Sequence, residues 1–332
     1  MPLLGKYRFS FDTWKRLEVE EDFLEESEEI EDPYVELKDW RPLQGKECNH
    51  INVAFVDGVR RTEHLIYIED EEGNFSEGVF VSVGAGGILM KHGRLNSMNH
   101  SIKGMSIKRF LVLKKGFNIG ESLLRFELEG TAIEFSVDFA EGELSPFVNE
   151  LMSRMESMVA ENLYRSHKPE LMITDGTVHY NAKLKSLPFV GYVKKHRRRY
   201  VPSEETWIFR ELKLGERTPL IRLHSQPTME GGGATTFDKF TWYVRISEDE
   251  GISGIARLEV SAGIGLNRAK ELADMSTYIV PKFASTEFTD RRAPHNLLPI
   301  KHLENALRKA LGSQTLIRRV ITKELLTNPQ AP

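Results

Sequence analysis

The sequence predicts an α/β protein with a mixed central sheet flanked by helices, and three observations support this. Between residues 51 and 140, runs of β-branched and aromatic residues alternate with short polar connections, as is typical of neighbouring antiparallel strands. A long segment with apolar residues at helical spacing follows. It leads into the apolar run 170–176, and a helix that feeds such a run is typical of α/β packing with a central strand.

The N-terminal forty residues are acidic, and we expect one or two polar helices there, ending at Asp32-Pro33 because a residue before proline disfavours helix. Residues 17–39 hold twelve acidic residues and one basic residue, a charge of −11. The whole chain carries −4, so the remainder carries +7. This acidic segment could be a solvated surface, a protein-docking surface or a cover over a basic groove.

We therefore divide the 332 residues into three parts. Residues 1–45 form an acidic helical arm, residues 46–326 form one α/β domain, and residues 327–332 form a disordered tail. No repeat or long linker divides the domain further.

Strands are expected in four runs of the first half, and the alternating segments 123–130 and 132–139 extend the same sheet. The runs are 51–57, 62–69, 77–86 and 108–114. The glycines of 84–87 lack the spacing of a dinucleotide site, so we expect them to end a strand.

A helix of about five turns is expected to begin at Ser145-Pro146, since serine caps helices and proline suits their first turn. In the second half we expect four further strands and three further helices, with a glycine-rich loop over 226–239. The strands are 206–212, 219–224, 240–247 and 254–260, and the helices are 266–280, 299–311 and 316–326.

Several function classes are disfavoured by what the sequence lacks. The first residues show no secretory signal pattern and no apolar run reaches membrane-spanning length, so we expect a soluble, cytoplasmic protein without a membrane partner. Cys48 is the one cysteine, which excludes an internal disulfide and a cysteine-rich zinc site. There is no Walker A motif and no G-x-S-x-G motif, so neither ATP hydrolysis nor a serine nucleophile is indicated.

Two predicted strands end in Asp-Gly, at Asp57-Gly58 and at Asp175-Gly176. Each apolar run delivers a carboxylate to the end of a strand, and the glycine lets the backbone turn or another group approach. Carboxylates that converge in this way suit Mg²⁺ or Mn²⁺, and such ions can activate water for phosphodiester cleavage.

The order of FVDG at Asp57, a long helix and ITDGT at Asp175 resembles the NurA family of DNA-end-processing nucleases. The resemblance implies a ribonuclease-H-like (Piwi-like) fold. It also implies a glutamate ligand on the helix, which would be Glu156, with Glu150 and Glu161 as alternatives.

Later motifs agree in order and approximate spacing, from Gly191 through Tyr243 to the C-terminal run APHNLLPIKHLENAL. The resemblance implies that Lys194 or Lys195 stabilises charge on the phosphate and that Tyr243 orients the substrate or water. His302 would be a fourth metal ligand, with His295 as the alternative. The chain departs from the family pattern here, because Ala293 stands where the family has a tyrosine.

Basic residues that could bind phosphates lie in three places, and Tyr200 could stack on a base. They are Arg60 and Arg61 after the first Asp-Gly, the run Lys194, Lys195, Arg197, Arg198 and Arg199, and the pair Arg291 and Arg292. Such contacts would give affinity without sequence preference.

The predicted function is a nuclease that uses Mn²⁺, or alternatively Mg²⁺, on DNA ends and single-stranded DNA. The resemblance implies 5′ to 3′ exonuclease and single-strand endonuclease activity in double-strand-break repair by recombination. It also implies a homodimer docked on a hexameric HerA-type ATPase translocase. Two alternatives are a non-catalytic nucleic-acid-binding scaffold with the same fold, and a phosphodiesterase that acts on RNA.

Overall fold

The computed structural model of the chain describes most of its 332 residues. The described residues are 8–11, 28–90, 100–117, 119–128, 130–178, 184–194, 198–225, 228–230, 233–235, 237–248, 252–286 and 293–326.

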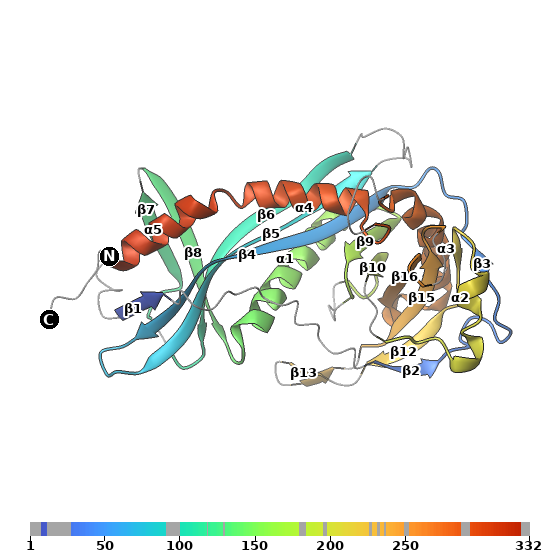
Figure 1. Cartoon of the computed structure of the whole chain (residues 1–332), viewed down its shortest axis with the longest axis horizontal. Helices are drawn as coiled ribbons and strands as arrows, with labels where there is room; N and C mark the ends of the chain where they lie inside the picture. Colours follow the sequence, from blue (N-terminus) through green and yellow to red (C-terminus); the bar gives the residue numbers. More distant parts are fainter. Residues whose placement is uncertain are drawn as a thin grey trace.

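One mixed sheet runs through the molecule, and its longest strands are β4 (Val53–Glu69), β5 (Phe75–Met90) and β6 (His100–Lys114), paired antiparallel. They extend along the long axis in Figure 1. Beyond β6 the sheet continues with β8 (Thr131–Ala140), parallel to it, and β7 (Leu123–Leu128). The mixed sheet expected from the sequence is confirmed.

On the other side of β4 the pairing becomes parallel. β9 (Leu171–Asp175) lies beside β4, and β10 (Phe189–Val193) lies beside β9, both parallel. Four antiparallel strands complete this half: β16 (Ile255–Ser261), β15 (Lys239–Arg245), β12 (Ile221–Ser225) and β2 (Glu28–Asp32). Strand 170–176 is therefore central, as expected.

Short strands pair at the margins of this sheet, and one hairpin stands apart from it. β1 (Arg8–Phe11) pairs with β4, and β11 (Glu216–Arg217) pairs with β15 and with β3 (Leu43–Gln44). The hairpin is β13 (Thr228–Glu230) with β14 (Gly233–Thr235).

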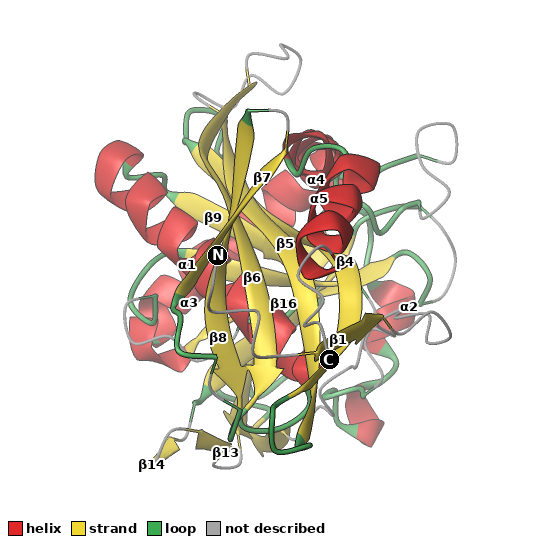
Figure 2. Cartoon of the chain, turned by 90° about the vertical axis from the view of Figure 1, so that its left-hand side faces the viewer, coloured by secondary structure: helices red, strands yellow, loops and turns green. Residues whose placement is uncertain are grey.

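Helices cover both faces of the long strands, as Figures 1 and 2 show. α1 (Leu144–His167) packs on one face and α4 (Leu298–Ala310) on the other. α3 (Leu266–Ile279) packs over β15, and α5 (Gln314–Leu326) packs against β4 and β7. A short α2 (Ile208–Glu211) and the 3₁₀ turns Ser203–Glu205, Ala262–Ile264 and Val280–Phe283 complete the described helices.

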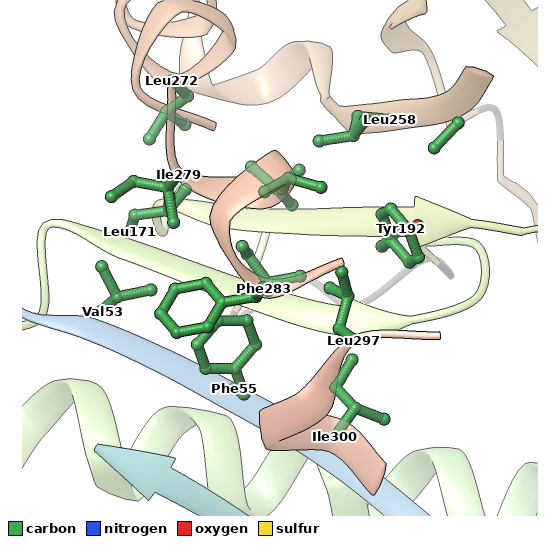
Figure 3. Close-up of a cluster of buried hydrophobic side chains, with 14 of the residues drawn as sticks. Val53, Phe55, Leu171, Tyr192, Leu258, Leu272, Ile279, Phe283, Leu297 and Ile300 are labelled. Carbon is green, nitrogen blue, oxygen red and sulfur yellow. The ribbon is translucent and has the colours of Figure 1, made fainter. Parts of the chain in front are cut away.

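The long helix forms because its apolar residues recur every three or four positions and make one buried stripe. That stripe is Leu144, Val148, Leu151, Met155, Val159, Ala160 and Leu163. It packs on the β4 face that carries Ala54 and Val56. The alternate residues Val53 and Phe55 face the other core, with α3 and α4 (Figure 3).

Several expectations for individual elements were wrong. Residues 8–11 and 28–45 contain strands and turns and no helix, so the helical arm is corrected for the described part of it. Pairing partners decide this, because β2 lies against β12 and the carboxylate of Glu28 bonds a buried lysine. The proposed tail 327–332 lies outside the described residues.

The segment 206–212 is not a strand but contains α2. Ile208 and Phe209 on this turn pack into a core cluster with Tyr243, which fixes the helix despite its β-favouring residues. Likewise, the expected loop 226–239 contains the hairpin of β13 and β14 within its described residues.

The glycines of 84–87 do not end a strand, because β5 runs through them to Met90. A side chain at Gly87 would collide with Leu163 of α1, and one at Gly84 would lie 2.7 Å from Ile107. These glycines therefore let a helix and a neighbouring strand approach closely. The runs 51–57 and 62–69 are also joined in one strand, β4, with an irregularity between Thr62 and His64. Asp57-Gly58 therefore lies inside β4 and does not end a strand, whereas β9 does end at Asp175 as expected.

A buried ion network ties β2 to the sheet. Lys239 bonds Glu28 at 2.8 Å and Glu259 at 3.0 Å, and Glu259 has no exposed surface. Burial would lower the pKa of Lys239, but the two carboxylates outweigh burial and raise it. The network thus anchors the N-terminal strand by paired charges.

Lys239→Met should lower the free energy of unfolding by about 3–5 kcal/mol, because it removes the cation that bonds both Glu28 and Glu259 and leaves these buried carboxylates less compensated. Urea unfolding at neutral pH measures this. Lys115→Met is the matched control, since Lys115 pairs with Glu141 on the surface and its loss should leave stability unchanged. Equal stability of the two variants would contradict this prediction.

None of the described helices is long and apolar enough to cross a membrane.

Candidate active site

Asp57 and Asp175 lie at adjacent positions of two parallel strands. The register pairs Val56 of β4 with Thr174 of β9, and each aspartate is the next residue. Phe55 and Ile173, two residues earlier, both face the core beneath α4, so alternation puts both aspartates on that same face. The convergence of the two carboxylates follows from this register.

Glu156 approaches from α1, on the other face of β4, and reaches the backbone N–H of Gly58, the residue after Asp57, which lowers the pKa of both carboxyl groups. An added Cβ at Gly58 would lie 2.5 Å from Oε1 of Glu156 and 2.8 Å from Cγ of Met152, so a glycine there makes room for the glutamate. Glu150 and Glu161 instead pair with Arg154 and Arg165 along the helix. Among the three candidates, the structure brings Glu156 to the aspartates.

Neighbouring carboxyl groups raise the pKa of Asp57 and of Glu156. Burial raises the pKa of Asp57 well above its ordinary value, and the charges of Asp175 and Glu156 raise it further. Burial and Asp175 also raise the pKa of Glu156, to about 8, against a bond from the Gly58 backbone that lowers it. The cluster therefore holds more negative charge than its surroundings compensate.

Lys194 supplies part of the compensation. Its ammonium group bonds Oδ2 of Asp175 at 2.5 Å and Oδ1 of Asn296 at 3.0 Å. Its charge lowers the pKa of Asp57. Asn296 is 1% exposed and precedes α4, and sequence reasoning missed it because neither its residue type nor its spacing marks it.

The donor set fits a hard divalent cation, because it consists of carboxylate oxygens whose mutual repulsion a cation would relieve. The carboxylate oxygens of Asp57, Glu156 and Asp175 do not all lie within 4.8 Å of one another, the spacing of atoms that could share one metal ion. Among the described residues, the set that meets this distance is Glu31, His224 and Asp238. That set is an ion-pair network, because Arg222 bonds Glu31 and Asp238 at 2.8 and 2.9 Å.

Close contacts with the loop after Asp175 favour a glycine at position 191. A Cβ there would lie 2.8 Å from the carbonyl oxygen of Gly176 and 3.1 Å from the amide nitrogen of Val178. The loop after Asp175 thus folds directly over β10, and Val178 N–H donates to Glu259 at 2.7 Å.

Comparison with known families decides the relationship, since the NurA domain matches residues 51–308, most of the chain. The chain belongs to the NurA family. This is a family of nucleases that process DNA ends, so membership implies hydrolysis of phosphodiester bonds. No match was found among curated proteins.

The NurA resemblance also indicated a tyrosine and a histidine, and these residues differ in burial: Tyr243 is buried and His302 is exposed. Tyr243 lies fully buried in the cluster around α2, and its hydroxyl accepts a bond from Tyr200 N at 3.0 Å. Its side chain thus packs in this core cluster, and its role toward substrate or water stays a prediction. His302 is exposed on α4. The next residue, Leu303, packs against Gly86, which is the strand partner of Asp57. His295 adjoins Asn296, so both histidines remain candidates.

The predicted base-stacking role of Tyr200 is wrong in this structure. Its side chain has no exposed surface, its hydroxyl donates to Glu28 at 2.8 Å, and the guanidinium of Arg257 lies 4.9 Å from its ring centre. A base could not reach a ring enclosed in this way.

The predicted phosphate-binding arginines have different surroundings. Arg61 donates to Glu63 and to the carbonyl oxygen of Gly312 after α4, so it ties β4 to that helix. Arg60 is half-buried, Arg198 donates to the Glu28 carbonyl oxygen, and Arg199 is exposed. The remaining candidates, Lys195, Arg197, Arg291 and Arg292, lie outside the described residues.

Gly58→Ala should displace Glu156, since the new methyl group would occupy the space of its carboxylate, while the fold survives because the glutamate end is flexible. Cleavage of single-stranded DNA should fall by about tenfold or more, as for other misplaced catalytic groups. Gly142→Ala is the control, because a Cβ at Gly142 meets nothing within 4 Å. Equal activity of the two variants would refute the role given to Gly58.

Stability should depend on pH through Glu156. Its pKa is raised from 4.5 when unfolded to about 8 when folded, so its contribution is fully present below pH 4.5 and is lost as pH rises through about 8. Urea unfolding in EDTA across this range should show stability falling more steeply for the native chain than for Glu156→Gln. Parallel pH profiles would show that Glu156 is not the group responsible.

Proposed function

We propose that this protein is a metal-dependent deoxyribonuclease that acts on DNA ends and single-stranded DNA. One observation carries the proposal: Asp57 on β4 is buried, and the charges of Glu156 from α1 and of Asp175 at the end of β9 lie near enough to raise its pKa, which Lys194 offsets only in part. Structural carboxylates are normally paired, so uncompensated buried ones indicate a functional site. Strands β4, β5 and β6 pair antiparallel, and β9 and β10 continue from β4 in parallel. This mixed order supports a ribonuclease-H-like sheet.

Asp57, Glu156 and Asp175 would hold the cation, with His302 or His295 as a further ligand. A bound Mn²⁺ or Mg²⁺ activates water and stabilises charge on the phosphate oxygens. Lys194 is placed beside the carboxylates to bind a phosphate oxygen, and Asn296 holds its side chain in that place. Burial of Asp57 at 8% exposure keeps bulk water from screening these charges.

The finer assignments rest on family membership together with this site. They are 5′ to 3′ exonuclease and single-strand endonuclease activity, resection of broken ends in recombination repair, and Mn²⁺ as the metal. We extend the proposal to a homodimer that works with a HerA-type hexameric ATPase, since the sequence has no Walker A motif of its own.

The test is cleavage of end-labelled single- and double-stranded DNA with Mn²⁺, Mg²⁺ or EDTA. The native chain should cut with Mn²⁺ and fail in EDTA. Asp57→Asn and Asp175→Asn should abolish cutting and keep the fold, because each removes a ligand charge without changing shape. Lys194→Met should lower kcat by about 10²-fold, as expected for one lost electrostatic stabiliser.

Lys301→Met is the matched control for Lys194→Met, since Lys301 is a lysine on α4 for which no catalytic part is proposed. DNA binding without cutting, with the ATPase partner supplied, would contradict the proposal and indicate a scaffold. Cutting of an RNA strand in preference to DNA would correct the substrate.

A further inference from the structure

Tyr192 on β10 is fully buried, yet its hydroxyl has no hydrogen-bond partner among the described residues. Figure 3 shows its ring in the apolar cluster that also contains Leu297 and Ile300. A buried hydroxyl without a partner destabilises the folded state, and a phenylalanine would fill the same space without that cost. The hydroxyl therefore needs an explanation outside the packing of this core.

Its neighbour is a proposed metal ligand. The parallel register of β9 and β10 makes Tyr192 the direct partner of Asp175, and partners of this kind project to the same face of a sheet. Burial first, and then the negative charge of Asp175, raise the pKa of Tyr192, so the phenol stays protonated and remains a donor. The register thus sets Tyr192 next to Asp175, whose carboxylate can accept a hydrogen bond from the hydroxyl.

In the structure that carboxylate is bound by Lys194, whose ammonium group is 2.5 Å from Oδ2 of Asp175. An ammonium on a metal ligand would repel a divalent cation and would draw charge away from it. A neutral hydroxyl can hold the same carboxylate and leave its charge to the cation. Ligand carboxylates are generally held by such an outer hydrogen bond.

We propose that Tyr192 is a positioning residue for Asp175: when Asp175 binds a divalent cation and Lys194 turns to the substrate phosphate, the Tyr192 hydroxyl donates to Asp175 in place of Lys194. This inference rests on the metal-dependent function proposed above. It explains the unpartnered hydroxyl as a donor whose acceptor becomes available in the metal-bound state.

Tyr192→Phe in the full chain tests this, with Mn²⁺ affinity measured by calorimetric titration and thermal unfolding measured in EDTA. Mn²⁺ should bind at least about tenfold more weakly, as for the loss of other outer hydrogen bonds to metal ligands. The unfolding temperature in EDTA should stay the same or rise, because the variant loses a buried group that had no partner. Cleavage by Tyr192→Phe should fall at limiting Mn²⁺, and saturating Mn²⁺ should restore part of it.

Tyr200→Phe is the matched control, because Tyr200 is equally buried but its hydroxyl donates to Glu28 at 2.8 Å. It should unfold at a lower temperature and bind Mn²⁺ like the native chain. The two substitutions remove the same atom, so opposite effects would separate metal positioning from core stability.

Native Mn²⁺ affinity in Tyr192→Phe would overturn the inference and leave the nuclease proposal standing. A lower unfolding temperature of Tyr192→Phe in EDTA would also overturn it, since the hydroxyl would then serve the fold itself. If the native chain binds neither Mn²⁺ nor Mg²⁺, the metal-dependent function fails, and this inference fails with it.

Discussion

The parallel pairing of β4 with β9 is the constraint on which the candidate site depends. Because Val56 is in register with Thr174, the next residues are two aspartates side by side on one face. A register shift of one residue would turn one of them to the opposite face. The apolar residues before them, buried on both faces of the sheet, make such a shift costly, so the core that stabilises the fold also fixes the carboxylates.

Glycines let the remaining parts of the site approach. Gly58 leaves space for Glu156 between helix and strand, and Gly191 leaves space for the loop after Asp175. The same loop is held by Glu259, which belongs to the buried network of Lys239 and Glu28. The N-terminal strand and the loop after Asp175 thus bond to one buried network.

Burial has opposite consequences for the charges of this molecule. Lys239 and Arg217 lie among carboxylates that compensate them, so their charges stabilise specific contacts. At Asp57 and Glu156 burial adds to repulsion, and their pKa values rise. Folding therefore disfavours the charged forms of these two carboxyl groups, and the cation proposed for this site would offset that cost.

The sequence by itself determined the α/β class, the central strand before Asp175 and the helix of Glu156, and it drew attention to the two aspartates, because apolar periodicity and Asp-Gly after an apolar run are local signals. It also sufficed for the family. Only the tertiary structure selected Glu156 over Glu150 and Glu161, enclosed Tyr200 and Tyr243 in the core, and brought Asn296 to Lys194 across 102 positions. Those outcomes depend on which surfaces pack together, and packing between distant segments leaves no pattern in either segment alone.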